Sequence, residues 1–324
     1  MHAVTIDRYG PPDVFRYEEV ETPVPGPGEV RVRVHATATA AGDWHLMRGD
    51  PLPVRLMFGL LRPRFRILGA AAAGTVEAVG SGVDLSLGAP VFGDLSDCGF
   101  GGFAEYVCVP ADALLPKPDE VSFEEAAAAA GSAVTALQAL RAGGEPLDGA
   151  NVLVNGASGG VGTYAVQIAR ALGAEVTGVC STRNVELVRS LGASRVVDYT
   201  REDFTEGGAT YDRIVDAAAY RPLSDNLDAL RPGGRYVFVG GAMGTMYRIM
   251  LFGPLAARRR GVSITLLLTK VVREDLATVA DLLASGRVRS VIDRTYPLPD
   301  VAAAVGYVEE GHARGKVVVV PTAP

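Results

Sequence analysis

Residues 151–162 read Asn-Val-Leu-Val-Asn-Gly-Ala-Ser-Gly-Gly-Val-Gly. The first half is a short apolar run that is typical of a buried parallel strand, and the second half is a glycine-rich turn. Residues 163–173 then carry apolar side chains on a helical period and end in Gly173, where a helix is expected to stop. A strand, a glycine turn and a helix in this order predict the phosphate-binding corner of a dinucleotide fold.

The glycines indicate how this corner would bind a phosphate. Backbone N–H groups at a helix N-terminus hold a pyrophosphate, and the helix dipole helps them. Gly159 and Gly160 would let the backbone come close, and Gly162 would let the helix pack on the strand. The spacing differs from G-x-G-x-x-G, because Ala157 takes the first position and Gly156 precedes it. An ordinary tight turn is the alternative, and the strand-like run that follows at the right distance argues against it.

The end of that second strand, residues 175–180, indicates which cofactor binds. A fold that prefers NAD usually places an acid there for the ribose 2′-hydroxyl, about 20 residues after the glycines. Here residues 181–184 read Ser-Thr-Arg-Asn, and the first acid is Glu186. Hydroxyls and a guanidinium suit a 2′-phosphate, so the sequence predicts NADP(H) over NAD(H). A solvated helix-start position is the alternative role for Arg183.

Composition sets limits on the class of protein. The chain has 324 residues, enough for two domains, and its hydrophobic fraction of 48% and charged fraction of 21% are ordinary for a globular protein. A net charge of −6 argues against nucleic acid as a main partner. Three cysteines are too few for a disulfide framework, and neither a signal peptide nor a membrane-spanning run is evident. We therefore expect a cytoplasmic protein without a membrane or nucleic-acid partner.

Residues 1–120 and residues 121–270 have different patterns. The first part carries short strand candidates between glycine-rich turns, which predict a small β-barrel or sandwich. Its strand candidates are residues 30–36, 73–80, 90–93 and 104–109. The second part opens with an alanine-rich helix and then alternates apolar strands with helices, so it predicts a doubly wound α/β domain.

The strands predicted for the second part are residues 152–154, 176–179, 195–197, 213–215, 236–239 and 263–268. Residues 271–324 contain a predicted helix over 274–284 and a closing strand over 316–320, and we expect this tail to return to the first domain. The fold class is therefore α/β, with a Rossmann-type parallel sheet and a β-rich second domain. Ligand sites favour domain interfaces and strand ends, so we expect the active site in the cleft between them.

These stretches resemble the medium-chain dehydrogenase/reductase superfamily, and within it the zinc-independent, quinone oxidoreductase-like branch. The resemblance covers nearly the whole chain and includes Asp-Trp-His-Leu-Met-Arg-Gly at 43–49, Phe-Ala-Glu-Tyr-Val at 103–107, the turn at 155–162 and Gly-Lys-Val-Val at 315–318. It implies a GroES-like catalytic domain and a Rossmann domain that binds NADPH. It also implies a homodimer that pairs through the Rossmann sheet edge, for which residues 263–268 are apolar enough.

The resemblance also implies positions that bind the cofactor. Arg183 falls where the family binds the 2′-phosphate, Tyr199 lies by the adenosine end, and Thr135 lies near the nicotinamide. Gly240 and Gly241 fall in a loop that passes the nicotinamide. The predicted cofactor-binding set is Thr135, Asn155, Gly156, Ser158, Gly159, Gly160, Val161, Ser181, Thr182, Arg183, Tyr199, Gly240 and Gly241.

The metal positions of the family are where this sequence departs from it. Zinc-dependent relatives bind zinc through a cysteine soon after the first barrel strand and a later His-Glu pair. Here residues 39–43 read Thr-Ala-Ala-Gly-Asp and residues 69–74 read Gly-Ala-Ala-Ala-Ala-Gly. Zinc needs three or four N, S or O ligands, so we expect no metal. Ala40 and Ala71 also replace an asparagine and an aspartate that are common in the zinc-free branch, which predicts a more apolar pocket.

Without a metal, nothing obvious would lower the pKa of an alcohol or polarise a ketone. Hydride transfer from NADPH to a quinone or an α,β-unsaturated carbonyl compound needs mainly orientation and hydrogen bonds. We therefore expect an NADPH-dependent oxidoreductase acting on a small hydrophobic quinone or enone. The alternatives are a zinc-free NADP(H)-dependent alcohol/ketone oxidoreductase and a catalytically silent NADPH-binding regulatory protein.

No residue identifies itself as the proton donor. The candidates are Asp43, Trp44 and His45, and their alternative roles are a helix cap, core packing and a surface histidine. Apolar side chains in residues 57–61 and 246–252 would shape a hydrophobic substrate site or a lid, or would be buried core.

Overall fold

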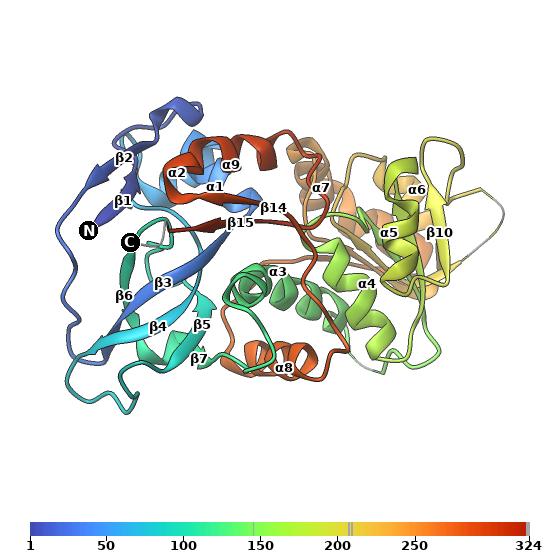
Figure 1. The fold of residues 1–324 in the computed structure, drawn as a ribbon. Coiled ribbons are helices and arrows are strands. Elements are labelled where there is room, and N and C mark those ends of the chain that lie inside the picture. The colour runs from blue at the N-terminus through green and yellow to red at the C-terminus, as the bar shows by residue number, and fades with distance from the viewer. Residues whose placement is uncertain (145, 207, 209, 322–324) are drawn as a thin grey trace. The chain divides into compact units, whose positions relative to one another are not determined.

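The chain divides into two compact units (Figure 1). A computed structural model describes residues 1–144, 146–206, 208 and 210–321. Unit 1 is Met1–Val134 together with Lys270–Pro324, and unit 2 is Thr135–Thr269. The C-terminal segment therefore belongs to unit 1. The first boundary lies inside helix α3 (Phe123–Arg141), whereas the sequence pattern had placed it at residue 120.

Unit 1 is built on a seven-stranded sheet in which β14, β15, β3, β4, β5 and β7 are successive neighbours, and β6 also pairs with β3. Neighbouring strands are antiparallel except for β14 and β15. In β3, Val30, Val32 and Val34 are buried while Arg31 and Arg33 are more exposed, which is the predicted alternation. The strands are β3 (Glu29–Thr39), β4 (Ala71–Val79), β5 (Pro90–Asp94), β6 (Tyr106–Pro110), β7 (Leu114–Pro116), β14 (Ile292–Pro297) and β15 (Lys316–Val320).

The closing strand β15 lies beside β3, so the C-terminal segment completes the core of unit 1 (Figure 1). Val317 and Val319 are fully buried there, together with Met47, Leu68 and Phe103. The sequence missed β7, β14 and the separate antiparallel pair β1 (His2–Thr5) and β2 (Arg16–Glu19). The helices of this unit are α1 (Ala41–Arg48), α2 (Leu52–Phe58), the first part of α3, α8 (Arg273–Ala284) and α9 (Val301–Glu309).

The alanine run in α3 is buried on all sides. Ala126–Ala130 are at most 1% exposed, which confirms a closely packed helix rather than a linker. Gly131 follows the run, and a Cβ at this position would lie 2.7 Å from Asp94 Oδ2. The small side chains therefore allow α3 to approach the end of β5 closely.

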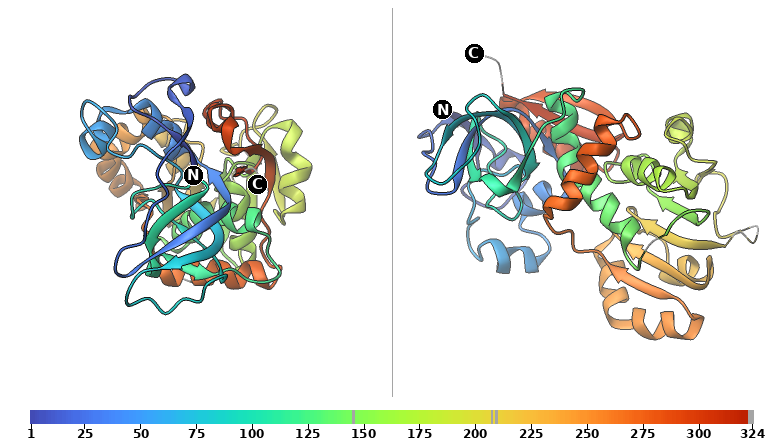
Figure 2. Two further views of the ribbon diagram at one scale, coloured as in Figure 1. Left: turned by 60° about the vertical axis from the view of Figure 1, so that its left-hand side comes forward. Right: turned by 90° about the horizontal axis from the view of Figure 1, so that it is seen from below.

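Unit 2 contains six parallel strands in the order β10-β9-β8-β11-β12-β13. All six predicted strands are present, although β13 ends at Leu266 rather than at residue 268. Helices flank this sheet (Figures 1 and 2), as predicted for a doubly wound α/β fold. The elements are β8 (Asn151–Asn155), α4 (Gly162–Ala171), β9 (Glu175–Cys180), α5 (Val185–Ser190), β10 (Arg195–Asp198), β11 (Tyr211–Asp216), α6 (Leu223–Asp228), β12 (Leu230–Phe238), α7 (Met243–Arg260) and β13 (Ser263–Leu266).

The strand order fixes where a ligand would bind in unit 2. Because the strands are parallel, all their carboxyl ends lie at one edge of the sheet. The chain order reverses between β8 and β11, and the loops at such a reversal leave a crevice for ligands. Among the described residues, no helix is both long and apolar enough to cross a membrane.

Candidate active site

The turn after β8 is tight on its inner side and open on its outer side. Gly156 has a left-handed backbone with φ of 78°, and a Cβ there would lie 2.9 Å from Ala218 Cβ. A Cβ at Gly162 would lie 2.0 Å from Gly156 O, so only glycine fits at the start of α4. At Gly159 the one contact within 4 Å is Gly156 O at 3.4 Å. The backbone at Gly159 is therefore open to a ligand.

Unpaired N–H groups line the outer side of this turn. Thr163 N donates to Gly159 O at 3.0 Å, but within the described residues the N–H groups of Gly160, Val161 and Gly162 have no acceptor. The first N–H groups of a helix have no partner inside the helix, and they favour an anion together with the helix dipole. The predicted turn residues thus form a cradle that fits a pyrophosphate.

A buried polar network joins the ends of β8, β11 and β12. Asn155 Nδ2 donates to Asp216 Oδ1 at 2.8 Å and to Ala218 O at 3.0 Å, and Tyr236 OH donates to Asp216 Oδ2 at 2.7 Å. Burial raises the pKa of Asp216, while these hydrogen bonds oppose the shift. Both donors of the Asn155 amide are used inside the protein. Asn155 therefore positions the loops, and the sequence did not reveal its partners Asp216 and Tyr236.

The loop after β12 is held against the loop after β11. Ala219 N donates to Gly240 O at 3.0 Å, and Gly240 N donates to Asp216 O at 3.3 Å. Gly241 has φ of 145°, and a Cβ at this position would lie 2.4 Å from Ala219 N. Gly241 is thus required by a close approach of two backbones at the carboxyl ends of the strands, whereas a Cβ at Gly240 would meet only Ala217 O at 3.8 Å.

The loop after β9 carries the residues predicted for the 2′-phosphate. Thr182 Oγ1 donates to Asp198 Oδ2 at 2.6 Å, and Asp198 Oδ1 accepts from Thr200 N and Oγ1 at 3.1 and 2.8 Å. The Thr182 hydroxyl, with these other donors, holds the pKa of Asp198 below its usual value. The Thr182 proton is therefore used inside the protein. Ser181 is half-buried and Arg183 is exposed.

Asn184 connects two of the predicted residues, and the sequence did not single it out. Its Nδ2 donates to Ser158 Oγ at 2.9 Å and to Ser181 Oγ at 3.2 Å. Its buried Oδ1 receives no hydrogen bond from the described part of the chain. The other two predicted residues lie at the margins. Tyr199 is exposed at the end of β10, and Thr135 Oγ1 in α3 is 3.0 Å from Thr269 Oγ1.

The three catalytic candidates lie in α1 of unit 1, which spans Ala41–Arg48. Asp43 is 1% exposed, and its carboxylate accepts Ala40 N at 2.8 Å and Gly69 N at 3.2 Å. Burial raises its pKa to about 6. Both oxygens cap backbone N–H groups, which is a structural use of the side chain.

The rings of Trp44 and His45 contact each other at a tilt of 31°, with centroids 3.5 Å apart. Trp44 also packs against the core of unit 1. His45 Nδ1 lies 2.7 Å from Asp50 O, and because a carbonyl only accepts, this nitrogen carries the proton. These contacts agree with core packing as the role of Trp44 and with a surface role for His45.

A buried lysine near Asp43 was not predicted as part of a site. Lys316 is 5% exposed, and its Nζ donates to Thr39 O at 2.9 Å. Burial lowers its pKa to about 8, and the charges of Asp43 and Asp94 oppose the shift. Burial also raises the pKa of Asp94. Around this polar cluster the start of β4 is apolar, since Ala71–Ala73 are at most 5% exposed.

Most of the apolar side chains expected at a substrate site or in a core are exposed. Within their own units, Phe58 and Met246 pack partly against core clusters. The exposed ones are Met57, Leu60, Leu61, Tyr247, Met250 and Phe252. Buried core is therefore the wrong reading for these six.

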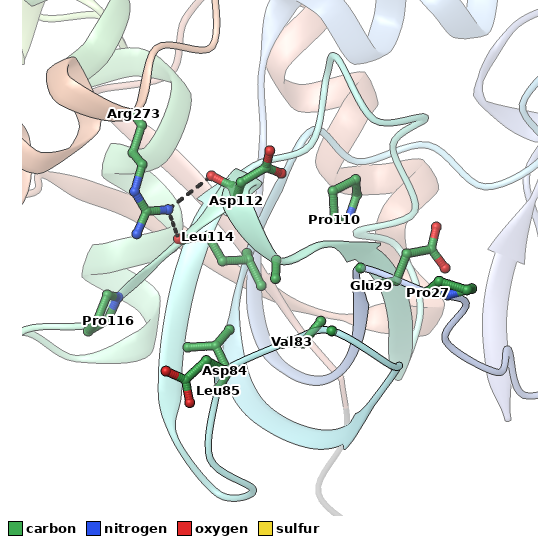
Figure 3. A pocket seen from close by; sticks show the side chains of 13 residues that line it. Pro27, Glu29, Val83, Asp84, Leu85, Pro110, Asp112, Leu114, Pro116 and Arg273 are labelled. Atoms are coloured by element: carbon green, nitrogen blue, oxygen red, sulfur yellow. Dashed lines mark hydrogen bonds between the residues drawn. The ribbon is translucent and has the colours of Figure 1, made fainter.

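Unit 1 also has an open surface pocket of about 660 Å³ that contains none of the predicted residues (Figure 3). The Arg273 side chain lies along one side of this pocket, and its Nη1 donates to Asp112 O at 3.0 Å and to Leu114 O at 2.7 Å. Glu29 and Asp84 lie on its rim. Arg273 Nη1 is therefore used by backbone carbonyls of unit 1.

Comparisons with known proteins identify the family. The family model described as alcohol dehydrogenase GroES-like domain matches residues 26–119, and the one described as zinc-binding dehydrogenase matches residues 191–319. The chain is 36% identical over 287 residues to the chloroplast envelope quinone oxidoreductase homolog of Arabidopsis thaliana, covering 84% of this chain and 86% of that protein. This chain belongs to the medium-chain dehydrogenase/reductase superfamily, in its quinone oxidoreductase-like branch.

Two further relatives of this quinone oxidoreductase-like chain have informative names. A trans-enoyl reductase of Aspergillus terreus is 32% identical over 273 residues, covering 76% of this chain and 75% of that protein. The crystal structure of Escherichia coli quinone oxidoreductase complexed with NADPH matches with a TM-score of 0.84 and 26% identity, covering 99% of this chain and all of that chain. The predicted superfamily, the fold and the oxidoreductase class are thereby confirmed, and the cofactor is a nicotinamide nucleotide.

One of the matching family descriptions names zinc, but the residues of this quinone oxidoreductase-like chain do not fit that ion. In the part of the chain that the structure describes, no group of three or more His, Cys, Asp or Glu side chains is placed to hold a metal. Burial raises the thiol pKa of Cys98 and of Cys108 to about 11, whereas zinc binds the thiolate. The positions that bind zinc in zinc-dependent relatives, after the first barrel strand and at the start of β4, are occupied by alanines in this chain.

Proposed function

We propose that this protein is a metal-independent reductase that uses NADPH to reduce quinones or α,β-unsaturated carbonyl compounds. One observation carries the cofactor preference. The loop at the end of β9 presents the Ser181 hydroxyl and the Arg183 guanidinium, and the nearby carboxylate of Asp198 accepts hydrogen bonds from Thr182 and Thr200. Hydroxyl and guanidinium donors favour a 2′-phosphate over a 2′-hydroxyl.

The residues of unit 2 bind and orient the cofactor in this proposal. The N–H groups of Gly160, Val161 and Gly162 would hold the pyrophosphate. The Asn155–Asp216–Tyr236 network would keep the loops after β8, β11 and β12 in place while the nicotinamide is bound. NADPH supplies the hydride when it is bound, and the protein contributes position and electrostatics.

The residues of unit 1 favour an activated acceptor. Asp43 accepts hydrogen bonds from two backbone N–H groups, Lys316 donates to a backbone carbonyl, and His45 Nδ1 donates to another backbone carbonyl. Each of these three side chains therefore has a structural use within unit 1. A quinone or an enone accepts hydride without a Lewis acid, because the charge that develops is delocalised in the product. The names of the quinone oxidoreductase and enoyl reductase relatives agree with this class.

The proposal is tested by the oxidation of NADPH with a quinone, a 2-alkenal and a saturated ketone under the same conditions, with NADH as the control. We expect turnover with the quinone or the alkenal, a preference for NADPH, and no effect of a chelator. Turnover with the saturated ketone alone would instead support the alcohol/ketone alternative. Tight NADPH binding without turnover of any acceptor would support the regulatory alternative, which the alanine-lined β4 favours.

We also propose a homodimer that pairs along β13. This strand stands at the end of the strand order in the sheet of unit 2, and its four residues are all half-buried. An apolar face of α7 is exposed next to it in sequence and contains Tyr247, Met250, Leu251, Phe252 and Leu255. A molar mass of two chains in light scattering supports this pairing, and a single-chain mass argues against it. The cytoplasmic location stays a prediction.

A further inference from the structure

Asn184 lies between the two loops that would hold the phosphates of the cofactor. It ends the short 3-10 turn Thr182–Asn184 after β9, and its side chain is 5% exposed. One amide nitrogen reaches Ser158 in the turn after β8 and Ser181 in the loop after β9. Ser158 and Asn184 are 26 residues apart in the chain, so only the parallel pairing of β8 and β9 brings them together.

The direction of these two hydrogen bonds determines what the serines can do. An amide NH2 group only donates, so both serine oxygens accept from Asn184. Each O–H is then left to donate to something else, and within the described residues neither hydroxyl has an acceptor of its own. If the amide were turned so that Oδ1 accepted both protons, the serines would face the site with lone pairs only. Lone pairs repel a phosphate, whereas O–H groups bind it.

This arrangement has a cost, because Oδ1 of Asn184 is buried and receives no hydrogen bond from the described residues. A buried carbonyl oxygen without a donor is costly, and such atoms in folded proteins call for an explanation. Turning the amide by 180° would give Oδ1 two hydroxyl donors, but it would consume the two protons. Thr182 does not compete for this role, because its hydroxyl donates to Asp198. The protein thus leaves one acceptor unsatisfied and keeps two donors available at the cofactor edge.

We infer that Asn184 is a positioning residue that turns the Ser158 and Ser181 hydroxyl protons toward the phosphates of the bound nucleotide. Ser158 lies in the pyrophosphate turn and Ser181 beside Arg183, so one amide couples the pyrophosphate to the 2′-phosphate end. This inference rests on the proposed function, because it requires a phosphorylated dinucleotide at this edge. It adds a specificity-determining residue that makes no direct contact with the reacting atoms.

A double-mutant cycle measured by calorimetry with NADPH and with NADH tests the inference. We expect Ser181→Ala to weaken NADPH about tenfold and leave NADH unchanged, and Ser158→Ala to weaken both nucleotides about tenfold. Asn184→Ala is expected to weaken NADPH more than NADH. In the Asn184→Ala background, Ser181→Ala should then raise the Kd of NADPH less than threefold, because an unoriented hydroxyl contributes little to binding.

Asn226→Ala is the matched control, because Asn226 is also a fully buried asparagine of unit 2 with an unpartnered Oδ1. It should leave the NADPH-to-NADH ratio at the wild-type value. If Asn184→Ala does not fold, the isosteric Asn184→Asp takes its place in the cycle. Its carboxylate accepts from both hydroxyls, so we expect more than a hundredfold loss of NADPH.

Independent, multiplicative losses in the cycle, or wild-type binding by Asn184→Asp, would overturn the role of Asn184. The failure of the proposed NADPH preference has a different signature. If the wild type binds NADH as tightly as NADPH, the preference is wrong, and the cycle of Ser158→Ala with Asn184→Ala, measured with NADH, still decides the inference. If the wild type binds neither nucleotide, both the proposed function and the inference are wrong.

Discussion

The carboxyl edge of the unit 2 sheet and the alanine-lined interior of unit 1 use polar side chains in opposite ways. In unit 2, side chains bond to one another across loops, as Asp216 does with Asn155 and Tyr236. In unit 1, the buried charges of Asp43 and Lys316 bond only to backbone groups. This difference indicates that side-chain hydrogen bonds in unit 2 serve to position the loops of the cofactor site. The alanines at the start of β4 leave the surroundings of Asp43 and Lys316 apolar, which would suit the activated acceptor that we propose.

The largest effect is expected where the unit 2 network is broken. Asp216→Ala would leave the Asn155 amide and the Tyr236 hydroxyl without their acceptor at a fully buried position. We expect the free energy of unfolding to fall by about 3–5 kcal/mol. Urea unfolding measures it. The control is Asp228→Ala, an exposed carboxylate paired with Arg260, which should cost less than about 1 kcal/mol. Equal losses in the two variants would contradict the network.

The next effect concerns the cofactor that unit 2 selects. Arg183→Asp would place an acid at the end of β9, where a 2′-phosphate would be repelled and a 2′-hydroxyl bound. We expect the Kd of NADPH to rise about a hundredfold, as for the loss of a charged hydrogen bond with added repulsion, and the Kd of NADH to stay level or fall. Arg189→Asp, on the exposed side of α5, is the control. An unchanged Kd for NADPH would show that the preference has another origin.

The pH dependence of the free energy of unfolding tests the buried charge in unit 1. Lys316 in unit 1 has a pKa of about 8 in the folded protein and an ordinary value of 10.5. Between these values the unfolded chain binds a proton that the folded protein has released, so stability rises with pH. From pH 7.5 to 9.5 the wild type should gain about 1–2 kcal/mol relative to Lys316→Met.

Denaturant unfolding at the two pH values measures this gain. Lys270→Met, which changes an exposed lysine, is the control. A constant difference between the wild type and Lys316→Met across this range would mean that burial does not lower the pKa of Lys316.

The smallest effect is expected at the open side of the turn. Gly159→Ala adds a methyl group that meets only Gly156 O at 3.4 Å, so the fold should tolerate it. The methyl would occupy the space where a pyrophosphate approaches, and we expect about a tenfold loss for NADPH and NADH alike. Gly244→Ala, whose methyl would meet nothing within 4 Å, is the control. A loss of stability without a loss of binding would contradict the cradle.

The sequence predicted those parts of the fold that local patterns encode. The apolar runs of β8 and β9 predict a buried parallel sheet. The alternation of apolar and polar residues in β3 predicts an antiparallel sheet. The strands that were missed, such as β2 (Arg-Tyr-Glu-Glu) and β14, are short and polar and exist because distant segments pair with them. Helix α7 is expected from the sequence only as one of the helices that alternate with the strands, without bounds of its own.

The candidate site was predictable where glycine geometry encodes it, and less so where side chains converge from different loops. Gly156 and Gly162 are required by local backbone contacts, which their spacing reveals. The orientation of Ser158 depends on Asn184, and the fixed position of Thr182 depends on Asp198. These pairs form only through the register of neighbouring parallel strands. A single sequence does not report that register.

The central claim is that NADPH reduces an activated acceptor here without a metal. The most direct measurement is the rate of NADPH oxidation by a quinone and an enone, with the zinc content determined by mass spectrometry on the same sample. The account predicts full activity at a zinc content far below one ion per chain. Activity that rises in proportion to zinc and disappears with a chelator would contradict it.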